Sequence, residues 1–117
     1  MEAELRSLAT QDGEFLTEIR PVGDVFCITV RAEIGSKGNV GADLFDFDVC
    51  SPSWLDSELD RYSVLPGGHR LFMRKFDPEA VELYVRKRLR HATGAKWQEI
   101  ASKIGEWARW EFADYKG

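Results

Sequence analysis

Two segments of alternating apolar and polar residues, joined by a glycine-rich stretch, constrain the fold of this chain more than any other feature. From Asp24 to Ile34 apolar side chains occupy every second position, and the pattern returns from Asp43 to Cys50. A period of two is typical of a strand with one buried face. Residues 35–41 between them are rich in glycine, which tolerates the backbone angles of tight loops. The sequence therefore predicts an antiparallel hairpin.

The register of this hairpin can also be predicted, because residues opposite each other across antiparallel strands lie on the same face of the sheet. Phe45, Phe47 and Val49 must therefore oppose the apolar side of the first strand. The register that also leaves a loop of ordinary length pairs Ile28 with Val49, Val30 with Phe47, Ala32 with Phe45, Cys27 with Cys50, Thr29 with Asp48 and Arg31 with Asp46. A bulge in the loop would shift this register.

Capping signals predict helices after the hairpin. Serine or aspartate followed by proline is typical of a helix start, and such pairs occur at Ser51-Pro52 and at Asp77-Pro78. A third helix is predicted from Ala95. The side chains that we expect to be buried are Trp54, Leu55 and Leu59 in the first helix, Val81, Tyr84, Val85 and Leu89 in the second, and Trp97, Ile100, Ala101 and Ile104 in the third.

Weaker patterns predict strands at residues 2–8, 69–76 and 107–115. The last of these fits either a continued helix or a short strand with Ala108, Trp110 and Phe112 on one face, and we favour the strand. A chain of 117 residues, 44% of them hydrophobic, can bury one core but not two. We therefore predict a single α+β domain over residues 1–117, with a mainly antiparallel sheet of four or five strands and two or three helices.

Composition and charge argue against several functions. Sixteen basic and twenty acidic side chains give a formal net charge of −4, which repels a phosphate backbone, so we expect no direct nucleic-acid ligand. No segment approaches the roughly 18 apolar residues that span a bilayer, and the start at Met1 lacks a basic signal-peptide region, so we expect a cytoplasmic protein without membrane contact. Cys27 and Cys50 then remain reduced, although their direct opposition would permit a disulfide in an oxidising compartment.

The histidines and the basic run carry no recognisable chemistry. His69 follows a Gly-Gly turn and His91 ends a basic helix, and neither has a serine or cysteine nucleophile beside it in sequence. The basic run at residues 86–91 lies in the last turns of a predicted helix, where cations complement the helix dipole. We therefore predict a solvated helix end there, and no catalytic residue.

The carboxylates of the second strand are the other candidates. Asp43, Asp46 and Asp48 could suggest a site for a hard cation or an acid and base pair. The predicted register, however, places Arg31 opposite Asp46, which favours a cross-strand ion pair. We predict no metal and no cofactor, and we interpret the remaining carboxylates as a solvated acidic face able to meet a basic partner.

Three segments carry a resemblance to a known family. They are Phe45-Asp46-Phe47-Asp48-Val49-Cys50-Ser51-Pro52-Ser53-Trp54-Leu55, Trp97-Gln98-Glu99-Ile100-Ala101 and Trp110-Glu111-Phe112-Ala113-Asp114-Tyr115. In order and spacing the chain resembles the immunity protein 8 family of bacterial polymorphic-toxin and contact-dependent growth inhibition systems. The resemblance implies a small cytoplasmic antitoxin that binds and neutralises the toxin domain encoded beside it. It implies neither an enzyme nor a particular toxin.

An acidic inhibitor suits a nuclease toxin, because a basic substrate groove attracts a negatively charged partner. The residues that we expect to contact the cognate C-terminal toxin domain are Glu33, Asp46, Asp48, Asp56, Glu58 and Asp60, followed by Trp110 and Glu111. Trp107 and Trp110 are the tryptophans that we favour as interface anchors. The alternative function is a general protein-binding or regulatory module. An enzyme, a nucleic-acid module and a dimer formed at a sheet edge rank below these two.

Overall fold

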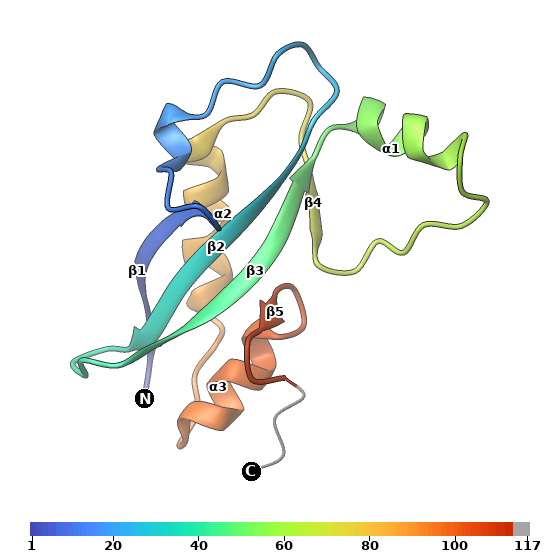
Figure 1. The fold of residues 1–117 in the computed structure, drawn as a ribbon. Coiled ribbons are helices and arrows are strands. Elements are labelled where there is room, and N and C mark those ends of the chain that lie inside the picture. The colour runs from blue at the N-terminus through green and yellow to red at the C-terminus, as the bar shows by residue number, and fades with distance from the viewer. Residues whose placement is uncertain (114–117) are drawn as a thin grey trace.

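A five-stranded sheet forms the centre of the fold in the computed structural model, which describes residues 1–113 (Figure 1). In chain order the elements are β1 (Ala3–Thr10), the 3-10 helix η1 (Leu16–Glu18), β2 (Cys27–Ser36), β3 (Ala42–Cys50), α1 (Pro52–Leu59), β4 (Arg70–Phe72), α2 (Pro78–Leu89), α3 (Trp97–Ile104) and β5 (Arg109–Trp110). The predicted α+β fold, with a mainly antiparallel sheet of four or five strands and two or three helices, is confirmed.

The hairpin of β2 and β3 is the longest pairing of the sheet and has the predicted register. All six predicted pairs are present, from Cys27 opposite Cys50 to Ala32 opposite Phe45. Six apolar side chains of these strands are buried: Val30, Ala32 and Ile34 on β2 and Phe45, Phe47 and Val49 on β3. Ile28, at the start of β2, is partly buried against the same core. Alternation on two adjacent strands therefore specified both the pairing and the buried face.

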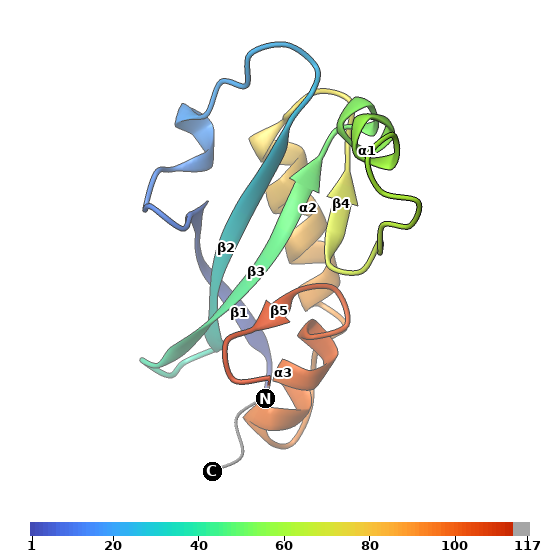
Figure 2. The same ribbon diagram turned by 45° about the vertical axis from the view of Figure 1, so that its right-hand side comes forward.

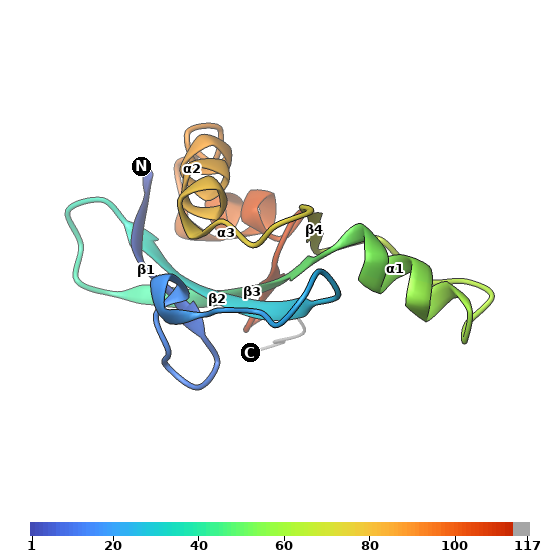
Figure 3. The ribbon, with the colours of Figure 1, turned by 90° about the horizontal axis from the view of Figure 1, so that it is seen from above.

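Helices α2 and α3 cover this apolar face, and within residues 1–113 no α-helix covers the opposite face of β2 and β3 (Figure 3). Asp77 caps α2 through bonds from the backbone N–H groups of Glu79 and Ala80, and Pro78 begins the helix, as predicted. The buried residues of the two helices are Val81, Val85 and Leu89 in α2 and Ile100, Ala101 and Ile104 in α3. Tyr84 and Trp97 are partly buried against the same core. One open face of the sheet is therefore left to solvent.

The two short strands both pair with β3, at different positions along it (Figure 2). Strand β4 runs parallel to β3 beside Asp48 to Cys50, whereas β5 runs antiparallel beside Phe45 and Asp46. The predicted strand at residues 69–76 is thus shortened to three residues. The strand favoured for residues 107–115 is confirmed for Arg109 and Trp110 only, and residues 114 and 115 lie outside the described part.

Helix α1 departs most from the sequence prediction. The predicted N-cap is confirmed, since the Ser51 Oγ atom accepts a hydrogen bond from the backbone N–H of Trp54. The prediction that Trp54, Leu55 and Leu59 form a buried side holds only in part, because Trp54 and Leu55 are half-buried and Leu59 is 45% exposed. Leu59 is exposed because α1 continues outward from the end of β3, away from α2 and α3 (Figures 1 and 3).

Candidate partner-binding surface

Asp46 lies on the open face of the sheet in a network that balances its charge. Arg31 Nε donates to Oδ1 at 2.9 Å and Arg31 Nη2 to Oδ2 at 3.0 Å, and Gln11 Nε2 donates to Oδ2 at 3.1 Å. The predicted cross-strand ion pair is therefore confirmed. Burial by itself would raise the pKa of Asp46, but the hydrogen bonds from Arg31 and Gln11 outweigh it and hold the pKa below its usual value.

Asp48, two residues further along β3, is also bonded within the fold. Its Oδ1 atom accepts from Thr29 Oγ1 at 2.8 Å and from Arg109 Nη2 at 3.3 Å. Its side chain is 16% exposed. The centre of the open face thus carries paired charges of both signs rather than a free acidic strip.

Glu33 and Glu111 differ in how far their carboxylates are engaged. Glu33 is exposed on the open face, and within residues 1–113 its side chain makes no hydrogen bond or ion pair. The Glu111 carboxylate accepts a hydrogen bond from the backbone N–H of Leu44 at 2.9 Å, and the Glu111 N–H donates to the Leu44 carbonyl at 3.0 Å. Glu111 therefore extends the pairing along β3, whereas Glu33 is available to a partner.

Trp110 is a packing residue of the domain. Its ring stacks on Phe45 with centroids 6.4 Å apart, and its indole N–H donates to Asp43 Oδ2 at 2.9 Å. Trp97 donates to the same oxygen at 2.7 Å. Asp43, which the sequence suggested only as a candidate acid, thus links two tryptophans that lie far apart in the chain. Trp107, the other favoured anchor, is 8% exposed and packs against Phe47.

The other three predicted acids lie on a projecting arm, which we define as residues 52–69: helix α1 and the loop that returns to β4 (Figure 1). Asp56 and Asp60 are exposed, and Glu58 is 3.9 Å from Arg61. The arm also exposes three large hydrophobic side chains, Leu59, Tyr62 and Val64. The structure therefore divides the predicted partner-binding residues between the open face with its β5 edge and the projecting arm, rather than gathering them in one site.

The two cysteines face each other at the end of the hairpin as free thiols. Their Sγ atoms are 3.0 Å apart, with Cys27 exposed and Cys50 buried. Burial raises the pKa of both thiols above their ordinary value, so little reactive thiolate forms at neutral pH. The arrangement resembles two packed thiols, as predicted, and not an activated nucleophile.

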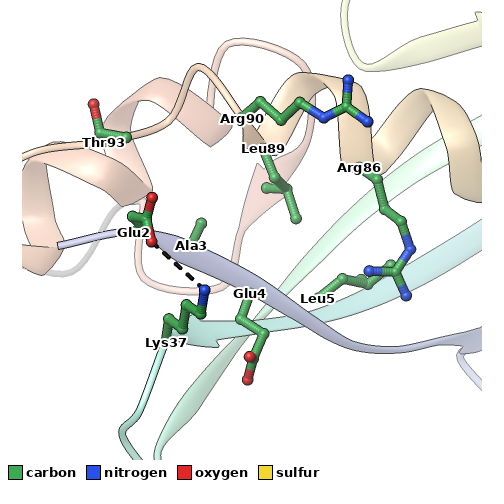
Figure 4. Close-up of a pocket in the computed structure, with 9 residues that line it drawn as sticks. All are labelled: Glu2, Ala3, Glu4, Leu5, Lys37, Arg86, Leu89, Arg90 and Thr93. Carbon is green, nitrogen blue, oxygen red and sulfur yellow. Dashed lines mark ion pairs between the residues drawn. The ribbon is translucent and has the colours of Figure 1, made fainter.

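A cavity of about 390 Å³ lies between β1 and the C-terminal turns of α2 (Figure 4). Its lining carries charges of both signs, and several are paired: Lys37 is 3.9 Å from Glu2, and Arg86 is 3.0 Å from Glu82 just outside it. In the same basic run, the Arg88 guanidinium lies over the ring of Trp107, 5.8 Å from its centroid. The cavity therefore offers no concentrated charge for a ligand.

The histidines stay apart from one another. His69 Nε2 lies 2.8 Å from the Gly105 carbonyl at the end of α3, and His91 is exposed beyond α2. Within residues 1–113, no group of three or more His, Cys, Asp or Glu side chains could hold a metal ion. None of the helices in the described part has the length and apolarity needed to cross a membrane.

The fold and its surfaces define a small α+β domain whose exposed polar and apolar side chains suit protein binding. A comparison with models of known protein families matches residues 3–115 to the family described as immunity protein 8. The chain therefore belongs to the immunity protein 8 family, and the resemblance of the three segments is confirmed. Membership implies neutralisation of a toxin of a polymorphic toxin system, and such proteins typically act as non-catalytic inhibitors. No curated protein and no solved structure matched the chain.

Proposed function

We propose that this protein binds a cognate C-terminal toxin domain, encoded beside it, and neutralises that domain by stoichiometric occupancy in the cytoplasm of the producing cell. The observation that carries the proposal is the family match over residues 3–115. The binding of a folded partner needs accessible side chains and no reaction centre, which agrees with the exposed acids and apolar residues described above.

A nuclease is the toxin class that the charge favours. The chain has a formal net charge of −4, and a nuclease presents a basic groove to its substrate. An acidic inhibitor would be steered toward that groove and would exclude nucleic acid from it. Occlusion of the substrate site is therefore the mode of inhibition that we propose.

The accessible acids are the first residues that we assign to the interface. Glu33, Asp56 and Asp60 are exposed, and within the described residues their carboxylates have no ion-pair partner. The other residues of the proposed set contribute through shape complementarity and weaker polar contacts with the toxin, because their polar groups already have partners within the protein. They are Asp46, Asp48, Glu58, Trp110 and Glu111.

Co-expression tests this function directly. The toxin domain encoded immediately beside this chain is produced in a sensitive host with and without the protein, and growth, co-purification and complex mass are measured. Rescued growth and a stable complex of fixed stoichiometry are expected. Toxicity without rescue and without a complex would contradict the proposed function. A purified toxin that cleaves neither DNA nor RNA would contradict the nuclease assignment alone.

A further inference from the structure

The projecting arm has a rigid base although no residue of its helix is fully buried. Immediately before the arm, Ser51 is 1% exposed, and its Oγ accepts hydrogen bonds from the N–H groups of Trp54, at 3.2 Å, and Phe26, at 3.1 Å. At the return, the His69 carbonyl accepts from the Asp48 N–H at 3.0 Å. The Arg70 guanidinium lies over the Trp54 ring, 5.5 Å from its centroid. Both ends are therefore fastened to the sheet.

An isolated helix as short as α1 is marginally stable in water, and most helices in proteins are stabilised by burying one face. Helix α1 has no fully buried residue: Trp54 and Leu55 are half-buried, and Leu59 is 45% exposed. A helix that is fastened at its ends and exposes one side is preorganised for a partner, since less conformational freedom is lost when the partner binds. The arm thus has the physical character of a binding element rather than of a packing element.

The exposed side chains of the arm combine apolar area with negative charge. Leu59, Tyr62 and Val64 are 45%, 48% and 79% exposed within six consecutive residues. Around them the arm carries Asp56, Glu58 and Asp60 against a single Arg61. An apolar centre with an acidic rim fits a surface that has an apolar recess edged by lysine or arginine.

We infer that the projecting arm is the main docking element for the toxin domain, with Leu59 and Tyr62 entering an apolar recess and the acids meeting its basic rim. This inference rests on the proposed function. The same charges disfavour an anionic membrane and a symmetric contact of the arm with the arm of a second copy, because either would place like charges together.

The test measures binding of the purified toxin domain, made inactive by substitution, to variants of the full chain. Two arm variants separate the contributions: Leu59→Ser with Tyr62→Ser for apolar contact, and Asp56→Lys with Asp60→Lys for charge. Controls elsewhere carry one substitution of each kind: Leu83→Ser, which alters a leucine of α2 that is 68% exposed, and Asp24→Lys in an exposed loop.

The apolar pair is expected to raise Kd by about tenfold or more, mainly through faster dissociation. The charge pair is expected to slow association by about tenfold at low salt. Both controls should stay within about twofold of the wild type. Because the four substituted residues of the arm are all exposed, the melting temperature of each arm variant should match that of the wild type, which excludes loss of folding as the cause.

Hydrogen exchange of the wild-type complex provides a second readout that needs no substitution. The amides of residues 52–69 are expected to exchange more slowly when the toxin domain is bound. Wild-type binding with unchanged affinity in both arm variants and unchanged exchange in the arm would overturn the inference while leaving the proposed function intact. Absence of wild-type binding would overturn both.

Discussion

A single carboxylate, Asp43, fixes the position of two tryptophans from different parts of the chain. Trp97 approaches Asp43 from α3 and Trp110 approaches it from β5. Both indole N–H groups donate to the Asp43 Oδ2 atom. Buried polar groups that lose their partner are costly, whereas a paired one stabilises the fold modestly. Asp43 therefore acts as a structural acceptor that joins α3 and β5 to β3.

Replacement of Asp43 by leucine is expected to lower the free energy of unfolding by about 1–3 kcal/mol, because two partly buried indole N–H groups lose their acceptor. Urea unfolding followed by far-UV circular dichroism measures the change. Asp43→Asn retains a carbonyl acceptor, so its free energy of unfolding should fall less than that of the leucine variant. Equal loss in the two variants would show that the side-chain oxygen is not the stabilising feature.

The Asp46 network predicts a pH dependence of stability. Because hydrogen bonds from Arg31 and Gln11 outweigh the effect of burial, the pKa of Asp46 is lower in the folded state than in the unfolded state. The resulting stabilisation is complete above the unfolded-state pKa of about 4 and is lost as the pH falls through the lower folded-state pKa.

The free energy of unfolding of the wild type should therefore fall more steeply between about pH 5 and pH 2 than that of Asp46→Asn. Urea titrations across this range measure both slopes. Identical slopes would show that Asp46 makes no net contribution to the acid sensitivity of the protein.

At the scale of elements, the hairpin of β2 and β3 shows what the sequence can predict. Two alternating strands and the loop between them leave one register that matches apolar faces, so the Arg31–Asp46 pair followed from the pattern. The starts of α1 and α2 were equally predictable, because a cap residue followed by proline acts locally.

The orientation of α1 could not be predicted by the same reasoning. An amphipathic helix has the same pattern whether its apolar residues meet the core of its own domain or the surface of another protein. The role of Asp43 was hidden for a related reason, since its partners are 54 and 67 residues away in the chain. Long-range packing, rather than local preference, decided both features and with them the candidate site.

Ser51 links the hairpin to α1, and its removal is expected to weaken both. Ser51→Ala leaves the N–H groups of Phe26 and Trp54 without their acceptor and should lower the free energy of unfolding by about 1–2 kcal/mol. Ser53→Ala, in the first turn of the same helix, is the control, because the Ser53 side chain makes no hydrogen bond within residues 1–113. Chemical denaturation measures the free energy of unfolding of both variants. A loss of the same size in Ser53→Ala would contradict a specific capping role.

At the scale of the whole molecule, the net charge of −4 predicts how the complex assembles. The association rate with the toxin domain should fall by about tenfold or more as the salt concentration rises from about 20 to 300 mM, while dissociation changes little. Stopped-flow fluorescence measures both rates. Association that is independent of salt would contradict electrostatic steering toward a basic groove.

Because α1 projects outward, its exposed positions tolerate substitution well. Substitutions of its exposed residues leave no cavity and require no compensating change in α2 or α3, because these side chains are not packed in the core. Such positions can accept many amino acids at little cost to folding. The projecting arm is thus the part of the molecule where a new binding preference can arise by a few substitutions while the rest of the domain stays the same.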